Sequence, residues 1–488
     1  MNRVNYKIGV ILDCEPSMGG SFQYALSLLE AVCFSSSKRG YKVCAFINND
    51  NWLQYLDHHI DTIFLESNRI LNAVMIDEQN CLVVFASLQS DWSNKLLTPV
   101  VVPIHDLMHR YEKEFPEVGD SEENANRDIM YHGNVRNAVS VLVDSEIGAA
   151  HVIDTFGQYY KDKVMVLPFA APRYMFEDEK RIDIPYEKYI FYPAQFWCHK
   201  NHKNLIKAIA LLKDRGISIN CIFVGHEKNG YEEAINLIEK YELSEQISIL
   251  GYVENAQMVY LYKHARAMIM PTYFGPTNIP PIEAIVSGCP VAVSNVYAMP
   301  DQLKDAAVYF DPGNPEEIAT VVQRYWVEDD FCREMIMKGK TIAGYFTQDS
   351  FNKRFDLLIA DILQRAEQKK EYAVELITFC RKFKRIFVYG AGDFASITIK
   401  TLEKLHIHVD GIIVTSIGKE KEKLETAFDK NIETINEHLF SSDDGIICSV
   451  YNPAYRQDIR KTLEQKIQLN NVLFIDGRKV KDTLESYI

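Results

Sequence analysis

Short apolar runs rich in β-branched residues alternate with longer stretches of helical periodicity along almost the whole chain. Runs of this kind are typical of buried strands, and their alternation with helices predicts βαβ units and parallel sheets. The first series of predicted strands is Tyr6–Leu12, Tyr41–Phe46, Cys81–Ala86, Val100–Ile104, Val139–Val143 and Val164–Leu167. The pattern therefore predicts an α/β lobe in the first part of the chain.

Two further series of strands follow, each after a predicted linker. The stretch Ala170–Pro185 contains prolines and a charged run, and precedes the strands Tyr189–Pro193, Ser218–Val224, Ile247–Leu250, Ala267–Met270, Val291–Val293 and Ala307–Phe310. Helices are predicted over Asn204–Arg215, Tyr231–Tyr241, Pro315–Trp326, Asp330–Tyr345 and Ser350–Glu367. After a predicted joint at Gln368–Glu371, the last strands are Arg385–Tyr389, Val409–Val414, Gly445–Ser449 and Val472–Ile475.

These series predict three α/β units. We expect Rossmann-like lobes over residues 1–185 and 186–367, and a smaller Rossmann-like accessory domain over residues 368–488. In open α/β sheets, ligands bind outside the carboxyl ends of the strands. Two lobes facing each other would therefore hold their chemistry in the cleft between them.

Composition narrows the function classes. The 488 residues are 47% hydrophobic and carry a formal net charge of −14, which excludes a nucleic-acid binder because phosphate neutralisation needs clustered Lys and Arg. Met1–Lys7 has no apolar segment typical of a signal peptide, and no apolar run reaches the ~20 residues of a spanning helix. The ten cysteines form no CxxC pair, which favours reduced, buried thiols. We expect a cytoplasmic protein.

The first lobe offers two candidate sites at strand ends. Gly19-Gly20, between the first strand and the first helix, would let a ligand approach the backbone at a helix N-terminus, although a tight turn explains the glycines equally well. His105-Asp106 directly follows Val100–Ile104, where His105 would reach a sugar hydroxyl or a developing charge. The alternative is a His-Asp pair that only fixes a loop.

The second lobe has a candidate cation after its first strand. Lys200 lies in the turn that leads to the helix near Asn204, and a cation beside a helix N-terminus suits a diphosphate leaving group. His199 and His202 are spaced as metal ligands sometimes are, but no carboxylate or thiolate cluster completes a site, so we predict no metal.

The segment Pro271–Ala284 gives the strongest signal. It follows an apolar strand, turns through Gly and Pro, and enters a helix near Pro280. The free N–H groups of Thr277, Asn278 and Ile279 would face an anion, and Glu283, one turn into the helix, would accept hydrogen bonds from ribose hydroxyls. A proline-rich turn before a buried helix explains the prolines but not an acidic residue among apolar neighbours.

From Lys7 to Gln364 the chain resembles family 4 glycosyltransferases of the GT-B fold. The matching pieces are Gly19-Gly20 with Gln23, Ile104-His105-Asp106, Val143-Asp144-Ser145-Glu146, Lys200-Asn201, Phe223-Val224-Gly225, Leu250-Gly251-Tyr252-Val253 and Phe274–Pro290. The predicted helix Ser350–Gln364 is similar to one that crosses back to the first lobe in this family. Each piece is short, and their order and spacing carry the resemblance.

The resemblance implies transfer with retention from a nucleoside-diphosphate sugar to a glycan or lipid-linked acceptor, without a bound metal and with no further cofactor. It assigns Lys200 to the diphosphate, Glu283 to the ribose and His105 to the transferred sugar. Gly20 would approach the diphosphate, and Gly251 and Val253 would line the base pocket. The context it implies is surface polysaccharide biosynthesis, with peripheral contact at the inner face of a membrane for a lipid-linked acceptor.

Two positions depart from the family pattern. Gln195 stands where an Arg is usual, which removes a positive charge from the diphosphate site, and Gly275 stands where a Glu usually binds sugar hydroxyls. These losses leave a second hypothesis open, a catalytically weak nucleotide-sugar-binding partner of another glycosyltransferase. A third is a related GT-B enzyme such as a phosphorylase or an epimerase.

The third unit contains a dinucleotide-like motif. Gly390-Ala391-Gly392 follows a strand and opens a helix, which is the context of an NAD fingerprint. The acidic residue expected at the end of the second strand is missing, because Thr415 follows Val414 and Asp410 precedes the strand. We therefore expect an accessory domain that binds no NAD, similar to nucleotide-sugar-binding-like domains attached to sugar-modifying enzymes.

Overall fold

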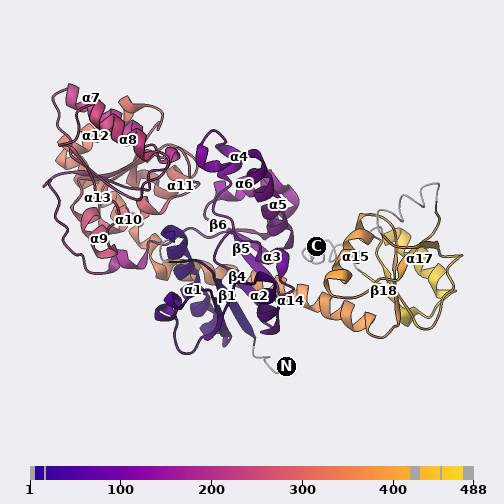
Figure 1. Ribbon diagram of the computed structural model, residues 1–488. Coiled ribbons are helices and arrows are strands. Elements are labelled where there is room, and N and C mark those ends of the chain that lie inside the picture. The colour runs from indigo at the N-terminus through magenta and orange to yellow at the C-terminus, as the bar shows by residue number, and fades with distance from the viewer. Residues whose placement is uncertain (1–5, 16–17, 418–428, 451–452, 476–488) are drawn as a thin grey trace.

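The computed structural model describes residues 6–15, 18–417, 429–450 and 453–475. It contains three parallel sheets, each flanked by helices, in the order predicted from the hydrophobic pattern (Figure 1). We refer to the units built on these sheets as the first lobe, the second lobe and the third domain. Among the described residues, no helix is both long and apolar enough to cross a membrane.

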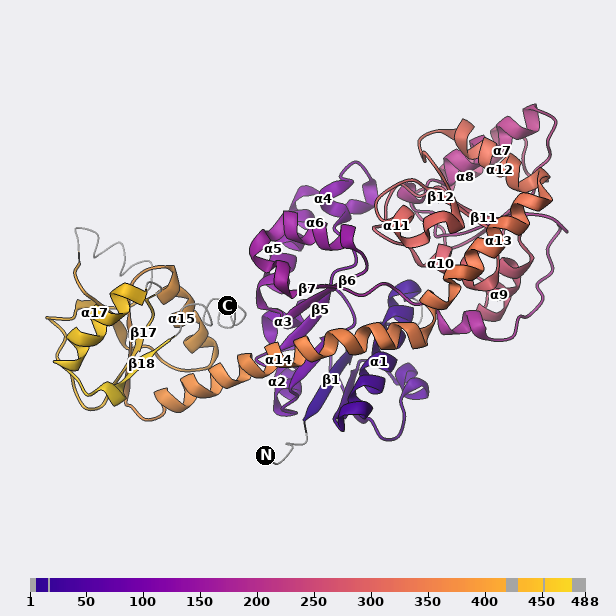
Figure 2. The same ribbon diagram turned by 180° about the vertical axis from the view of Figure 1, so that it is seen from behind.

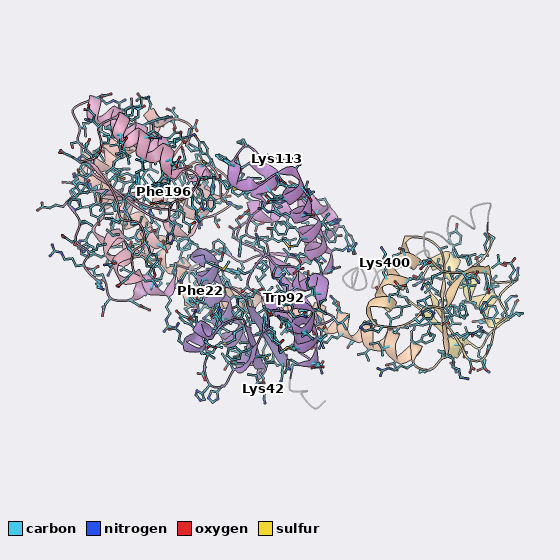
Figure 3. The ribbon with its side chains drawn as sticks, viewed as in Figure 1. Phe22, Lys42, Trp92, Lys113, Phe196 and Lys400 are labelled. Atoms are coloured by element: carbon cyan, nitrogen blue, oxygen red, sulfur yellow. The ribbon has the colours of Figure 1, made fainter. Side chains whose placement is uncertain are left out.

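The first lobe has a seven-stranded sheet in the order β3-β2-β1-β4-β5-β6-β7. Its strands are β1 Lys7–Leu12, β2 Lys42–Ile47, β3 Asp61–Phe64, β4 Val83–Ala86, β5 Val100–Pro103, β6 Ser140–Val143 and β7 Val164–Val166. Its helices are α1 Gly20–Arg39, α2 Arg69–Glu78, α3 Trp92–Lys95, α4 Met108–Tyr111, α5 Ser121–Asn137 and α6 Glu146–Phe156. Successive residues of β1 enter different cores, since Val10 packs with α1 and Ile11 packs on the other face. Phe22 and Trp92 lie on these two sides of the sheet in Figure 3.

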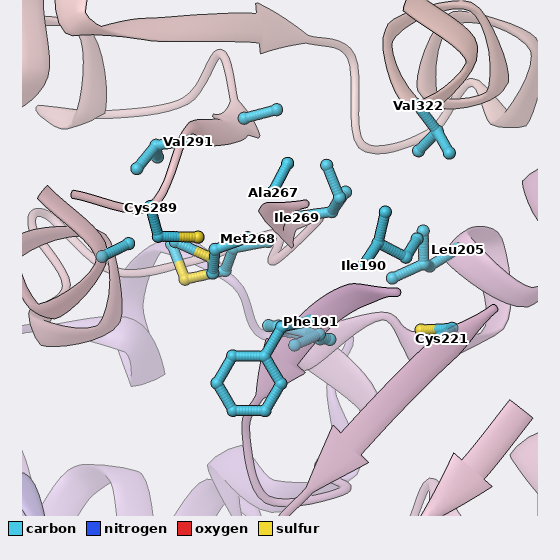
Figure 4. Close-up of a cluster of buried hydrophobic side chains, with 14 of the residues drawn as sticks. Ile190, Phe191, Leu205, Cys221, Ala267, Met268, Ile269, Cys289, Val291 and Val322 are labelled. Carbon is cyan, nitrogen blue, oxygen red and sulfur yellow. The ribbon is translucent and has the colours of Figure 1, made fainter. Parts of the chain in front are cut away.

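The second lobe has a six-stranded sheet in the order β10-β9-β8-β11-β12-β13. Its strands are β8 Ile190–Pro193, β9 Cys221–Val224, β10 Ile247–Ile249, β11 Ala267–Met270, β12 Val291–Ser294 and β13 Ala307–Phe310. Its helices are α7 His202–Asp214, α8 Tyr231–Lys240, α9 Asn255–His264, α10 Ile279–Ser287, α11 Met299–Leu303, α12 Pro315–Val327 and α13 Asp329–Ala343. Buried side chains of neighbouring strands, such as Phe191, Met268 and Val291, meet in one core (Figure 4).

The third domain has a five-stranded sheet in the order β16-β15-β14-β17-β18. Its described elements are β14 Arg385–Tyr389, α15 Asp393–Lys404, β15 Gly411–Val414, β16 Ile432–Thr434, β17 Asp444–Cys448, α17 Pro453–Glu464 and β18 Val472–Phe474. Its own hydrophobic cores contain Ile386 and Phe387, which point to opposite faces of the sheet.

The structure corrects the predicted joint at Gln368–Glu371. A single helix, α14, runs from Gln348 to Cys380 and passes straight through it, so the expected boundary between residues 367 and 368 lies inside a helix. Figure 2 shows α14 crossing the first lobe and continuing into the third domain. Phe355 of α14 is buried in the core of the first lobe, and Phe379 is buried in the core of the third domain. The same helix therefore belongs to both units.

Two strands were not predicted, β3 and β16, and each lies at the edge of its sheet. Edge strands need fewer apolar residues than central ones, so their hydrophobic signal is weak. In β3 both Asp61 and Phe64 are exposed.

Candidate functional site

The first and second lobes meet at the loops that follow the carboxyl ends of their strands. Gly19 caps α1 with a φ of +57°, a conformation that favours glycine. A Cβ on Gly20 would lie 3.2 Å from Cδ1 of Ile279, the first residue of α10. The start of α1, at the predicted glycine pair, therefore lies against the start of α10. A side chain larger than that of Gly20 would have little space there.

Lys200 projects from the turn between β8 and α7 to the start of α10. Asn201, in the left-handed conformation with a φ of +60°, ends this turn and donates to the carbonyls of Pro271 and Pro312. The Nζ of Lys200 donates to Oδ1 of Asn278 over 3.2 Å. Burial lowers the pKa of Lys200 to about 8, while the charges of Asp106 and Glu117 act in the opposite direction. Lys200 and Asn278, predicted separately, lie together.

The turn before α10 is shaped by Gly275. Its φ is +134°, and a Cβ there would lie 2.3 Å from Nδ2 of Asn278. Asn278 is held in place by Gln302 of α11, whose side chain accepts from the backbone N–H of Asn278 and donates to its carbonyl. The space beside Gly275 is therefore filled by an amide, and the backbone leaves no room for a side chain at this position.

Thr277, expected to face an anion, already binds a carboxylate. Oδ2 of Asp144 accepts from the backbone N–H of Thr277 over 3.2 Å and from its hydroxyl, while Oδ1 accepts from Ser145. Asp144 directly follows β6 of the first lobe and is buried, which raises its pKa to about 6. The N-terminus of α10 thus attracts an anion, as its N–H groups require. Asp144 was quoted for the resemblance but was not predicted as a site residue.

Glu283 lies one turn into α10 and is buried between two phenols. Tyr174 donates to Oε1 over 2.5 Å, and Tyr262 donates to Oε2 over 2.6 Å. Tyr174 belongs to the 3-10 turn Arg173–Phe176 in the linker between the lobes, and Tyr262 belongs to α9. Burial raises the pKa of Glu283, and the two hydrogen bonds act against that rise. Neither tyrosine was predicted, because no local pattern marks them.

His105 lies at the end of β5 among aromatic rings. Its backbone N–H donates to Gln89, and its imidazole contacts the rings of Tyr24 and Phe169 at centroid distances of 4.5 and 5.5 Å. Burial lowers the pKa of His105 to about 4, so the imidazole is neutral at pH 7. Its Nε2 has no hydrogen-bond partner within the described part of the chain. Asp106 caps the next turn by accepting from the N–H of Met108.

The remaining predicted site residues are Gln195, Gly251 and Val253, and each has a different environment. Gln195 accepts from the indole N–H of Trp197 within its own loop. Gly251 has a φ of +64° with open space around it, whereas Val253 is buried in the core of the second lobe. Tyr252 between them is 72% exposed and stacks on His226. The exposed side chain at this turn is therefore that of Tyr252, whereas the side chain of Val253 is buried.

A second contact between the lobes was missed by sequence reasoning. Glu117, in a 3-10 turn of the first lobe, accepts from the backbone N–H of His199 over 2.8 Å and pairs with its Nδ1 at 2.5 Å. The other carboxylate oxygen accepts from Asn229. His202 instead stacks on Phe196 at 4.1 Å inside the second lobe. His199 and His202 therefore have separate partners.

A pocket of about 520 Å³ lies between the lobes, and Asp144 and Thr277 form part of its wall. Its walls come from both lobes and from the segments that join them: Asp144, Ser145, Glu146, Val166, Pro168, Phe169, Thr277, Ala298, Asp301, Gln302, Lys304, Thr341, Ile342, Tyr345 and Phe346. This volume is in the range of small-molecule sites.

The glycine-rich loop of the third domain has the expected placement. Gly390 directly follows β14 with a φ of +119°, and a Cβ there would lie 3.0 Å from the carbonyl oxygen of Ser449. A pocket of about 440 Å³ opens beside it, lined in part by Ala391 and Thr415. Asp410 accepts from the N–H of Ile386 at the amino end of the sheet, away from this pocket.

The second lobe is similar in sequence to a known family of proteins. Residues 176–342 match the sequence model of glycosyl transferases group 1. The chain is 25% identical over 231 residues to O-antigen chain mannosyltransferase B of Escherichia coli, covering 45% of this chain and 60% of the relative. It is 27% identical over 170 residues to O-antigen chain mannosyltransferase RfbU of Salmonella typhimurium, covering 32% and 47%. The chain thus aligns with about half of each of these relatives.

Solved structures share the fold of both lobes. Sucrose-phosphate synthase from Thermosynechococcus elongatus superposes with a TM-score of 0.60 at 15% identity, covering 74% of this chain and 99% of that one. Anabaena HepE, solved in complex with UDP and glucose, gives 0.58 at 14% identity, with 73% and 99% covered. The paired Rossmann-like lobes form a GT-B fold, and residues 176–342 are a glycosyl transferases group 1 domain within it.

Proposed function

We propose that this chain transfers a sugar from a nucleoside-diphosphate sugar to a glycan or lipid-linked acceptor, with retention and without a bound metal. The observation that carries the proposal is the convergence of the Lys200 ammonium with the N-terminus of α10. A part-buried cation beside the N–H groups of a helix N-terminus is the arrangement that stabilises a diphosphate leaving group. The carboxylate of Asp144 on Thr277 supports an anion site at this point.

The remaining roles follow from position. Lys200 and the backbone at Thr277, Asn278 and Ile279 would bind the diphosphate, with Gly20 close on the other side. Glu283 would accept from the ribose, and neutral His105 would lie beside the transferred sugar. The protein would then act by positioning and electrostatic stabilisation and would supply no nucleophile of its own.

The two named relatives give the biological context. Both are O-antigen mannosyltransferases, so we infer surface polysaccharide assembly as the setting and a mannosyl donor as the first to test. A lipid-linked acceptor would bring the protein to the inner face of a membrane.

A second candidate is a catalytically weak nucleotide-sugar-binding partner. It is favoured by the filled space at Gly275 and by Gln195, whose side chain is engaged by Trp197. Such a protein would bind a nucleotide sugar without turning it over.

A donor screen distinguishes the two. Purified protein is incubated with a panel of nucleotide sugars, with and without glycan acceptors, and diphosphate release is measured. We expect release that falls about 100-fold or more in Lys200→Ala and Glu283→Ala, since each removes a group that contacts the donor. Lys203→Ala is the matched control, because Lys203 lies in the first turn of α7 and only approaches Glu233 at the surface. Tight binding without release for any donor would support the partner.

A further inference from the structure

The carboxylate of Glu283 is held by hydrogen bonds on both of its oxygens. Tyr174 and Tyr262 each donate one short bond, and the hydroxyl of Tyr262 also lies 3.2 Å from the carbonyl of Pro280 in the first turn of α10. A carboxylate with one partner on each oxygen cannot rotate without breaking both bonds. The two phenols therefore fix the plane of the carboxylate relative to α10.

The burial of this cluster decides where the protons lie. Tyr262 is fully buried and Glu283 is 6% exposed. Burial and the charge of Glu283 raise the pKa of both phenols well above their usual value, so the phenols remain protonated and act as donors. An ionised carboxylate offers about four acceptor positions, so two remain available on Glu283.

The two tyrosines come from different parts of the molecule. Tyr262 lies on α9 of the second lobe, the same lobe as Glu283. Tyr174 lies on the linker between the lobes, whose Ala171 N–H donates to the carbonyl of Phe346 just before α14. A segment that joins the lobes therefore reaches into the cluster around Glu283.

The cluster also adjoins the exposed aromatic turn after β10. Tyr252 is an electrostatic neighbour of Tyr174, and its ring stacks on His226 at 5.9 Å with an interplanar angle of 18°. Exposed aromatic faces stack well on nucleobases. A nucleoside with its base at Tyr252 would bring its ribose to the Glu283 end of the cluster.

We propose that Tyr174 is a positioning residue for nucleoside recognition: from the linker, it holds the Glu283 carboxylate so that its free acceptor positions bind the ribose hydroxyls. This inference rests on the proposed function, because it requires a nucleoside diphosphate in the site. Tyr262 supports the same carboxylate from within the second lobe. The linker is thereby part of the donor site.

Ribose discrimination measures this role directly. Isothermal titration calorimetry with UDP and GDP, and with their 2′,3′-dideoxy analogues, gives the ratio of the two dissociation constants for each protein. We expect the unmodified protein to favour the ribose form about tenfold or more, the effect of hydrogen bonds to a charged group. Tyr174→Phe and Glu283→Gln should each reduce the ratio to about 2 or less, because both misplace or weaken the acceptor.

Two variants separate this effect from a general loss of structure. Tyr325→Phe removes another buried phenol of the second lobe, one that donates to the carbonyl of Val291, and should keep the ratio. Lys200→Ala should weaken both ligands equally, because the diphosphate is common to them.

Each outcome has a consequence. A ratio that falls in Glu283→Gln but stays high in Tyr174→Phe would overturn the role of Tyr174 and leave the proposed function standing. Equal weakening of both ligands in Tyr174→Phe would show a structural role only. If the unmodified protein binds neither UDP nor GDP, the proposed function fails, and this inference fails with it.

Discussion

Gly275 sets the geometry of the turn that brings Asn278 to Lys200. Its positive φ is a conformation that side chains rarely adopt, and the amide of Asn278 occupies the position of a Cβ. A carboxylate cannot be restored here by a single substitution without moving Asn278 away from the ammonium group. The absence of a carboxylate at Gly275 thus goes together with the positive φ of this residue and with the contact between Asn278 and Lys200.

We predict that Gly275→Ala lowers the free energy of unfolding more than Gly251→Ala does. Both glycines have positive φ, but Gly251 has open space where a Cβ would be added. We expect a loss of about 1 kcal/mol at Gly251, from backbone strain alone, and about 2 kcal/mol or more at Gly275, where a steric clash is added. Urea unfolding followed by circular dichroism measures both, and equal losses would contradict the role given to Asn278.

Asp144 makes the contact between the lobes sensitive to pH. Burial raises its pKa from 3.8 to about 6, so the folded state holds a proton more tightly than the unfolded state. The stability that comes from this proton is complete below pH ~4 and is lost as the pH rises through ~6. Hydrogen bonds from Thr277 and Ser145 lower the pKa of Asp144, but burial has the larger effect and the pKa stays above 3.8.

We therefore predict a pH-dependent difference in stability between the unmodified protein and Asp144→Asn. The neutral amide resembles the protonated acid, so the two proteins should be closest near pH 4. Between pH 4 and 6.5 the unmodified protein should lose up to about 3 kcal/mol relative to the variant, the equivalent of the pKa shift. Unfolding curves at several pH values measure this, and a constant difference would show that Asp144 does not titrate as described.

At the level of elements, α14 is the helix that extends furthest beyond its predicted end. The helix is anchored to the first lobe by Asp356, which pairs with Lys38 and Arg39 of α1, and by the buried Lys369, which donates to the carbonyl of Asn137. Its polar stretch at 368–371 resembles a linker in composition only. Buried contacts on both sides of this stretch keep it helical.

A proline at the expected joint tests this directly. Glu371→Pro should destabilise the protein by about 3 kcal/mol, because proline removes a helical hydrogen bond and clashes with the preceding turn. Glu371→Ala keeps the helix and should be close to neutral, since Glu371 is exposed. Thermal unfolding measures the difference in stability between the two variants. Equal stability would support a flexible joint at 368–371 and contradict a continuous helix.

At the level of the whole molecule, a few polar contacts join the two lobes around the site. Glu117 receives three hydrogen bonds from the second lobe, Asp144 binds Thr277, and Glu112 accepts from Tyr297. Each joins residues of different lobes, and the ring of Phe115 also contacts that of Tyr273 between the lobes. Such contacts suit lobes that separate and rejoin as substrates enter.

We predict that Glu117→Ala shifts the lobes apart. The substitution leaves His199 and Asn229 without their partner, so the free energy that favours contact between the lobes falls. Spin labels placed on exposed positions of each lobe should report a longer or broader distance distribution in this variant. Glu122→Ala, which removes an acid from the first turn of α5, should leave the distribution unchanged. The same distribution in both variants would exclude Glu117 as a contact that holds the lobes.

The sequence by itself determined the three α/β units, nearly all their strands, and the positions of Lys200, Asn278 and Glu283 at the ends of strands and the start of a helix. Those features follow from local periodicity and from turn chemistry, which each segment carries within itself. The edge strands and the full length of α14 were not predicted. Their hydrophobic patterns are weak or depend on the elements that pack against them.

Only the tertiary structure decided which groups these residues meet. Asp144 and Thr277 are 133 positions apart in sequence, and Tyr174 and Glu283 are 109 apart. Each pair forms because two separately folded segments are placed side by side, and no local pattern records that placement. The burial that shifts the pKa values of Asp144, Lys200 and Glu283 arises in the same way, since it depends on what the rest of the chain packs around them.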